Sequence, residues 1–186
     1  MSLGAQSSGE PANEKHGLLA RLRESRDRYL CVVSSVPEEL SRIKPAGDCW
    51  SVLECAEHVA VAEKLMLRNF EKRRPTNEAP NFEKDTLITV TLLDRTHKRN
   101  APEPARPTGV YPSLAYAITE FKTAREKTLA QTEQNTDELR KFSVMHPLVG
   151  LIDAYQALWI IALHAERHAL QIEEIMKCPT YEARVK

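Results

Sequence analysis

The segment LIDAYQALWIIALHAERHALQIEEIM, from Leu151 to Met176, constrains the fold more than any other part of the chain. Its apolar residues recur with the period of an α-helix, so at 100° per residue they share one face. His164 and His168 lie inside this apolar stripe, whereas Glu166 and Glu173 lie opposite it. Residues four apart on a helix have Cβ atoms about 5–6 Å apart, so both imidazoles could reach one ion. The segment therefore predicts a long helix with two potential metal ligands on its apolar face. That face comprises Ala157, Ile160, Ile161, His164, His168, Gln171, Ile172 and Ile175.

The histidine pair also has a simpler interpretation as two packed core residues. A buried imidazole loses solvation free energy unless it finds a partner, and a backbone carbonyl is the usual one. Two adjacent histidines on an apolar face are harder to explain by packing alone. The pair by itself leaves both interpretations open, because a metal site of this kind needs a further protein ligand.

The composition argues against several classes of protein. Lysine plus arginine and aspartate plus glutamate both number 26, so the chain has no basic excess with which to release counterions from a nucleic acid. We therefore expect no nucleic-acid partner. The sequence has no run of about 18 apolar residues and no signal-peptide pattern, so we expect no membrane association. The 4 cysteines lack disulfide or CxxC spacing, which favours reduced thiols and a cytoplasmic location.

The length of 186 residues predicts one domain that can fold without a structural metal. Residues 1–13 are rich in Ser, Gly, Ala and Pro and show no periodicity, which predicts a flexible N-terminal tail. A helical pattern then runs from Glu14 to near Pro37. We expect a helical bundle over residues 14–178 and a C-terminal tail over residues 179–186.

A second helix has a clear start signal at Ser51, which forms a capping box with Glu54 three residues later. The predicted helix runs from Val52 to about Lys72 and carries His58 on the edge of its apolar face. His58 is the candidate third ligand, although a half-buried histidine bonded to a neighbour is the simpler interpretation of its spacing. The other histidines are weaker candidates. His16 and His97 have polar neighbours, and His146 precedes a proline in an expected turn.

The remainder of the chain predicts two more helical segments. Residues 74–112 form a long, proline-rich connection in which Phe82–Arg95 reads as a short helix. Ser113–Asn135 predicts another long helix, and residues 137–150 return the chain to the segment that starts at Leu151. No alternating pattern long enough for a convincing strand is visible. Four long amphipathic helices predict an all-α four-helix bundle, since this architecture buries four apolar stripes against one another.

Two stretches make the chain resemble the DinB/YfiT-like superfamily of metal-binding four-helix proteins. VPEELSRIKPAGDCWSVLECAEHVAVAE is similar to the proline and tryptophan that precede the second helix of that family and its single histidine. HPLVGLIDAYQALWIIALHAERHALQIEEI is similar to its His-Pro turn and its last helix with HxxxH. The resemblance implies an up-down-down-up bundle with a long crossover between helices 2 and 3. It also implies a divalent metal held by His58, His164 and His168, with zinc or nickel expected first and manganese or iron as alternatives.

The resemblance implies a metal-dependent enzyme that activates a thiol or water, most similar to thiol S-transferases, with a small-molecule substrate and a low-molecular-weight thiol as partner. A metal-dependent hydrolase is one alternative. The second alternative is a non-catalytic metal-binding protein of a stress response, for which a homodimer is considered. The third alternative is a metal-free bundle whose histidines only pack. Gln171 and Glu54, each one turn from a candidate ligand, could orient the site. Their simpler roles are a backbone hydrogen bond for Gln171 and the capping box for Glu54.

Overall fold

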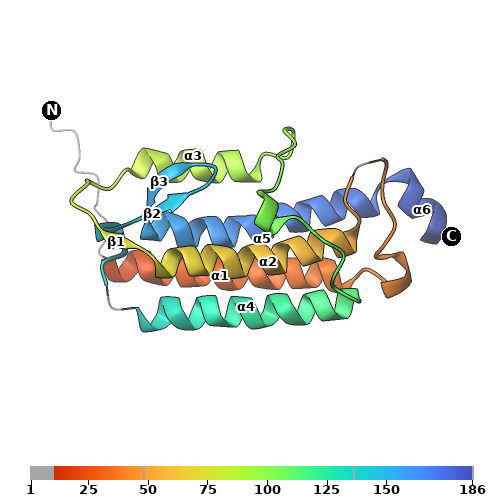
Figure 1. The fold of residues 1–186 in the computed structure, drawn as a ribbon, viewed down its shortest axis with the longest axis horizontal. Coiled ribbons are helices and arrows are strands. Elements are labelled where there is room, and N and C mark those ends of the chain that lie inside the picture. The colour runs from red at the N-terminus through yellow and green to blue at the C-terminus, as the bar shows by residue number, and fades with distance from the viewer. Residues whose placement is uncertain (1–10, 48, 136, 186) are drawn as a thin grey trace, which may run out of the picture.

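The computed structural model describes residues 11–47, 49–135 and 137–185. Within these residues, the bundle is formed by four long helices, which confirms the predicted all-α four-helix architecture (Figure 1). Their apolar faces fill two clusters of buried side chains, which lie along the common axis of the bundle. The long helices are α1 (Pro11–Ser34), α2 (Val52–Glu71), α4 (Leu114–Gln134) and α5 (Ala154–Met176).

Ion pairs between the helices show how they run relative to one another. Arg21 of α1 pairs with Glu166 of α5, and two turns further along both helices Arg28 pairs with Glu173. Contacts that advance together in this way show that α1 and α5 are parallel. Figure 1 shows α2 and α4 running in the opposite direction to that pair. The crossover from α2 to α4, the third helix of the bundle, therefore spans the length of the molecule.

Side-chain caps fix where α2 and α5 begin. The Ser51 hydroxyl accepts a hydrogen bond from the Glu54 N–H, and the Glu54 carboxylate accepts one from the Ser51 N–H at 2.8 Å. This is the predicted capping box, and it is confirmed. Asp153 and Gln156 form an equivalent box at the start of α5. The last long helix therefore begins at Ala154 rather than at the expected Leu151.

A small sheet that the sequence did not predict adjoins the start of α5. Its strands are β1 (Arg74–Pro75), β2 (Phe142–His146) and β3 (Gly150–Asp153), in the antiparallel order β1-β2-β3. Val144 and Ile152 pair across it and are buried. The strands have at most 5 residues, so their alternation is too short to recognise in the sequence. Gly150, the first residue of β3, takes a φ of +72°, a conformation that suits glycine at the end of the hairpin turn.

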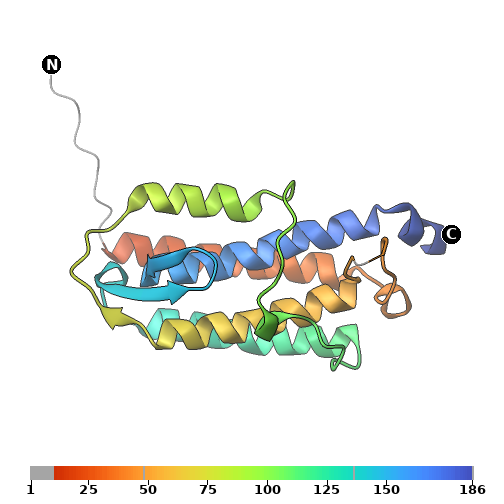
Figure 2. The same cartoon turned by 45° about the horizontal axis from the view of Figure 1, so that its top comes forward.

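The crossover contains the short helix that the sequence predicted. This helix, α3 (Phe82–Leu93), buries Ile88 and Leu92 against α5. The Trp159 indole N–H of α5 donates to the Thr89 hydroxyl of α3 at 2.9 Å. From the end of α3 the chain crosses α5 to the 3-10 turn η2 (Glu103–Ala105), which lies beside α2 (Figure 2). Two further 3-10 turns, η1 (Glu38–Leu40) and η3 (Leu139–Lys141), precede α2 and β2.

The two chain ends differ from the expected tails. Helix α1 already begins at Pro11, and residues 1–10 of the expected N-terminal tail lie outside the described residues. At the other end, α6 (Pro179–Val185) replaces the expected C-terminal tail over the described residues. Tyr181 explains the difference, because its ring is buried in the core cluster next to α5. In the part of the chain that is described, no helix has both the length and the apolarity needed to cross a membrane.

Candidate metal centre

Three histidines from two helices converge in the middle of the bundle. His58 comes from α2, and His164 and His168 come from successive turns of α5. One ring nitrogen from each lies within 4.8 Å of the other two. The Nε2 atoms of His58 and His164 are 3.1 Å apart, and the three ring centroids are separated by 4.5 to 5.0 Å. The structure therefore brings together the three histidines that the sequence analysis selected.

The geometry of these histidines fits a bound metal ion. Imidazole nitrogens bind zinc at about 2.0–2.1 Å, which places two such nitrogens about 2.9–3.4 Å apart in tetrahedral or octahedral coordination. The 3.1 Å between His58 and His164 falls in this range. The Nδ1 atom of His168 is buried without a hydrogen-bond partner among the described residues. A set of three imidazoles suits zinc, nickel and related divalent ions.

Burial keeps all three imidazoles in the form that binds metals. His58 and His168 are only 4% and 6% exposed, and His164 is half-buried. Burial lowers the pKa of His58, and the hydrogen bond to Ala105 offsets part of this effect. Burial also holds the pKa values of His164 and His168 well below the usual range, and the charge of a neighbouring histidine adds to it. The rings are therefore neutral at physiological pH, as metal ligation requires.

A backbone carbonyl of the crossover orients His58. The His58 Nδ1–H donates to the Ala105 oxygen of η2 at 2.6 Å, so Nε2 is the nitrogen that faces His164. Metal-binding histidines commonly have such a partner, which fixes the tautomer and the ring plane. The Trp50 ring packs against His58 with centroids 4.9 Å apart. Nothing in the sequence was a reason to select Ala105, because every residue carries a carbonyl and only the fold decides which carbonyl reaches His58.

Glu57, the neighbour of His58 on α2, holds the next part of the crossover. Its buried carboxylate accepts hydrogen bonds from the Thr108 N–H at 2.8 Å, the Thr108 hydroxyl at 3.0 Å and the Gly109 N–H at 3.1 Å. Gly109 has a φ of +75°, a conformation that suits glycine. Sequence analysis did not select Glu57. The only available signal was an acidic residue beside the candidate ligand on a mostly apolar helix.

Arg167, the neighbour of His168, holds the other side of the crossover. Its buried guanidinium donates to the carbonyl oxygens of Leu92, Asp94 and His97, which end α3 and begin the loop beyond it. The crossover is therefore attached to both helices that carry the histidines, through residues adjacent to the histidines themselves. This attachment places a fixed loop over the centre of the bundle.

The two residues proposed to support the site have different surroundings. The Glu54 carboxylate completes the capping box and pairs with Lys44 at 2.8 Å, so the structure gives it the simpler of its two predicted roles. The Gln171 side chain is half-buried and has no hydrogen-bond partner within the described ranges.

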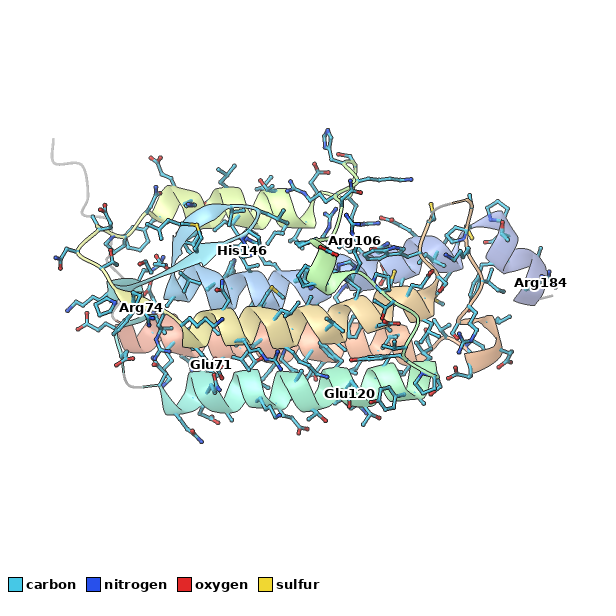
Figure 3. The ribbon with its side chains drawn as sticks, in the orientation of Figure 1. Glu71, Arg74, Arg106, Glu120, His146 and Arg184 are labelled. Carbon is cyan, nitrogen blue, oxygen red and sulfur yellow. The ribbon has the colours of Figure 1, made fainter. Side chains whose placement is uncertain are left out.

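The remaining histidines stay outside the group. His16 and His97 are exposed. His146 ends β2 and is half-buried, with its Nδ1 accepting from the Leu148 N–H at 3.2 Å. Figure 3 shows His146 on the hairpin and Arg106 on the crossover, two elements that lie over the same side of the bundle.

Comparisons with known proteins agree with the fold. YfiT from Bacillus subtilis, described as "a probable metal-dependent hydrolase with an unusual four-helix bundle topology", is 14% identical with a TM-score of 0.59 over 95% of this chain and 93% of that chain. TT2238, described as a four-helix bundle protein, is 16% identical with a TM-score of 0.51 over 86% of this chain and 98% of that chain. At these identities the likeness shows the fold alone. No curated protein sequence matches significantly.

A comparison with protein families identifies the family of this chain. The sequence model of the DinB superfamily matches residues 21–172, a range that contains all three histidines and the whole crossover. Because this match covers most of the chain, the protein belongs to the DinB superfamily.

Proposed function

We propose that this protein is a divalent-metal-dependent enzyme that activates a thiol or water, with transfer of a low-molecular-weight thiol to an electrophile as its first candidate reaction. The observation that carries this proposal is the convergence of three imidazole nitrogens within 4.8 Å. His58, His164 and His168 are the proposed ligands. Zinc or nickel is the proposed metal, with manganese and iron as alternatives that the same ligands accept.

The ligand set supports catalysis rather than a structural role for the metal. Structural zinc sites use four protein ligands, whereas catalytic sites use three and keep a position for an exchangeable ligand. When bound, a divalent cation supplies Lewis acidity, which lowers the pKa of a coordinated thiol or water. His164 is the least buried of the three histidines, so a substrate would approach from its side. The crossover held by Glu57 and Arg167 would form the wall of the substrate site.

The proposed partner is a small-molecule thiol, and a homodimer is the proposed assembly. All 4 cysteines carry free thiols, which supports a location in the reducing cytoplasm. A metal-dependent hydrolase is the second candidate function, because the structural neighbour YfiT is described in those words. The third is a non-catalytic metal-binding protein of a stress response.

Metal content is the first test. Protein purified without a histidine tag or added metal would be analysed for elements, beside the double variant His164→Ala/His168→Ala and the control His16→Ala, which removes an exposed histidine. We expect near-stoichiometric metal in the parent and in the control, and little in the double variant. Absence of metal from the parent, with failed reconstitution, would withdraw the enzymatic proposal.

Activity then separates the three functions. The metal-loaded protein would be incubated with glutathione, bacillithiol or mycothiol and a chlorinated aromatic acceptor. Transfer forms a carbon–sulfur bond and releases chloride and a proton, so chloride release that depends on the thiol supports the transferase. Thiol-independent cleavage of esters or amides would instead favour the hydrolase. A metal-loaded protein without either activity would favour the binding protein.

A further inference from the structure

A fully buried ion pair lies close to the three histidines and has no role in the proposed chemistry. Arg125 of α4 is 0% exposed and Glu63 of α2 is 1% exposed. The guanidinium meets the carboxylate through two parallel hydrogen bonds, Nε to Oε1 at 2.6 Å and Nη2 to Oε2 at 2.8 Å. This bidentate geometry is the most directional contact that the two side chains can form.

The same pair joins all four helices of the bundle. Arg125 also donates to the Leu22 carbonyl at 2.8 Å and the Ser25 hydroxyl at 2.9 Å, both on α1. Its Nη2 donates to the Ile161 carbonyl of α5 at 3.2 Å. The Thr128 hydroxyl of α4 donates to Glu63 Oε1 at 2.9 Å. Every guanidinium nitrogen is therefore bonded, and one side chain connects α1, α2, α4 and α5.

We call Arg125 and Glu63, with the groups that they bond, the hub. Its position along the helices places it near the histidines. Glu63 follows His58 on α2 by about 7.5 Å of helix, and Ile161 precedes His164 on α5 by about 4.5 Å, at 1.5 Å per residue. The hub therefore links α2 and α5 within two turns of the point where His58 meets His164. A shift of either helix along its axis would have to break these bonds.

The apolar contacts near the histidines define the register of the helices less well. Ala56 and Ala60 of α2 lie in the same buried cluster as Ala165 and Ala169 of α5. Methyl groups are small, and hydrophobic attraction has no direction, so these alanines restrain the register less than directional hydrogen bonds do. Buried ion pairs often contribute little net stability compared with apolar residues of similar volume, whereas buried polar groups in some helical assemblies select one register.

We propose that Arg125 and Glu63 are positioning residues that set the register of α2 against α5 and thereby hold His58 at bonding distance from His164. This inference rests on the proposed metal-binding function, and it assigns the pair to the geometry of the site rather than to the stability of the bundle. Neither residue touches the metal or the substrate.

The test replaces the pair by apolar residues of similar volume, in the double variant Glu63→Leu/Arg125→Met. Denaturant unfolding of the metal-free protein, the affinity for Co²⁺ against a competing chelator, and the visible absorption of bound Co²⁺ would be measured. We expect a denaturation midpoint at or above that of the parent. We also expect a Co²⁺ dissociation constant at least about tenfold higher, as for other losses of ligand orientation, and an altered absorption band. A folded double variant with parental affinity and spectrum would overturn the proposal.

Two further variants keep the test decisive. Arg125→Lys retains the charge but cannot form the bidentate pair together with the bonds to α1 and α5, so weaker Co²⁺ binding is expected even if the double variant fails to fold. Parental binding by Arg125→Lys would also overturn the proposal. The matched control is Arg140→Met, which removes another arginine held by carboxylates, those of Glu14, Asp85 and Asp153, near the start of α5. It should lower the denaturation midpoint and leave the Co²⁺ affinity unchanged.

A metal-free measurement separates this inference from the proposed function. The imidazole nitrogen chemical shifts of His58 and His164 report their mutual contact in the metal-free protein. We expect both to change in the double variant and to stay parental in Arg140→Met. If the parent bound no metal, the proposed function would fail, whereas these shifts would still decide whether the hub sets the register. Unchanged chemical shifts in the double variant would overturn the inference that Arg125 and Glu63 set the register.

Discussion

The Nδ1–H of His58 on α2 donates to the carbonyl oxygen of Ala105 on the crossover at 2.6 Å, across 47 residues of sequence. The orientation of one proposed ligand therefore depends on where a loop is held. The loop is held by Glu57, whose carboxylate binds Thr108 and Gly109 a few residues beyond Ala105. Glu57 and His58 are adjacent on the same helix, so the anchor of the loop and the ligand that the loop orients move together.

The first prediction is that Glu57→Gln weakens metal binding without contacting the metal. The amide oxygen accepts fewer and weaker hydrogen bonds than the carboxylate, so the loop and the Ala105 carbonyl become less fixed. We expect an affinity for Zn²⁺ about tenfold lower, which competition titration with a chromogenic chelator would measure. The free energy of unfolding should fall by about 1–3 kcal/mol, because buried donors lose a charged partner. Glu126→Gln, an exposed change on α4, serves as the control. Parental affinity in Glu57→Gln would contradict the role of the loop.

The second prediction is that metal stabilises the folded protein. The three imidazoles bind the ion only when they are brought together by folding, so a ligand at 100 times its dissociation constant adds about 2.7 kcal/mol. For a chain of this size the melting temperature should rise by about 5–10 °C. Thermal unfolding with Zn²⁺, and again after addition of a chelator, would measure the shift. His168→Ala should show no such rise, and an equal rise in that variant would place the bound metal elsewhere.

The third prediction concerns tryptophan fluorescence. The Trp50 ring lies 4.9 Å from the His58 ring, whereas Trp159 packs against Tyr155 and bonds to Thr89. An open-shell ion such as Ni²⁺ quenches an indole strongly at short range, so binding should quench Trp50 more than Trp159. Ni²⁺ would be titrated into Trp159→Phe, which leaves Trp50 as the only indole, and into Trp50→Phe, which leaves Trp159. The loss of fluorescence should be larger in Trp159→Phe. A larger loss in Trp50→Phe would argue against a metal at His58.

The fourth prediction is that α3 opens more readily than the helices beneath it. Only Ile88 and Leu92 of α3 are buried, whereas Leu87 and Val90 are 64% and 63% exposed. Local opening costs less where few apolar contacts are lost, so backbone amides of α3 should exchange hydrogen sooner than those of α5. Hydrogen–deuterium exchange followed by mass spectrometry would measure this. Thr89→Val, which removes the bond to Trp159, should accelerate α3 further, and equal exchange in α3 and α5 would refute the expectation.

The sequence predicted the individual helices because their signals are local. The capping box at Ser51 and the apolar periods of α2, α4 and α5 depend on residues within a few turns of one another. The hairpin before α5 was missed for a related reason. Its strands are short, and Leu151 fits the helical period of the segment behind it as well as it fits β3. The capping box formed by Asp153 and Gln156 decided the boundary, and it places the start of α5 at Ala154.

The spacing of His164 and His168 could be interpreted directly, since helix geometry fixes the distance between residues four apart. Their meeting with His58 could be expected only through resemblance to a family, because spacing along one helix contains no information about another. The residues that support the site could be predicted neither from helix spacing nor from the resemblance to a family. The Ala105 carbonyl has no side-chain signature, and Glu63 and Arg125 read as ordinary charged residues on two amphipathic helices.

The sequence by itself therefore determined the four long helices of the bundle and the faces of α2 and α5 that carry the histidines, since periodicity and capping act over a few residues. Only the tertiary structure decided that His58 lies 3.1 Å from His164, that Ala105 orients it, and that Arg125 and Glu63 are buried together. These contacts join residues distant in the chain, and they depend on the register in which the helices pack. That register is a property of the assembled bundle, in which directional bonds such as those of Arg125 act together with the packed core, and no local pattern records it.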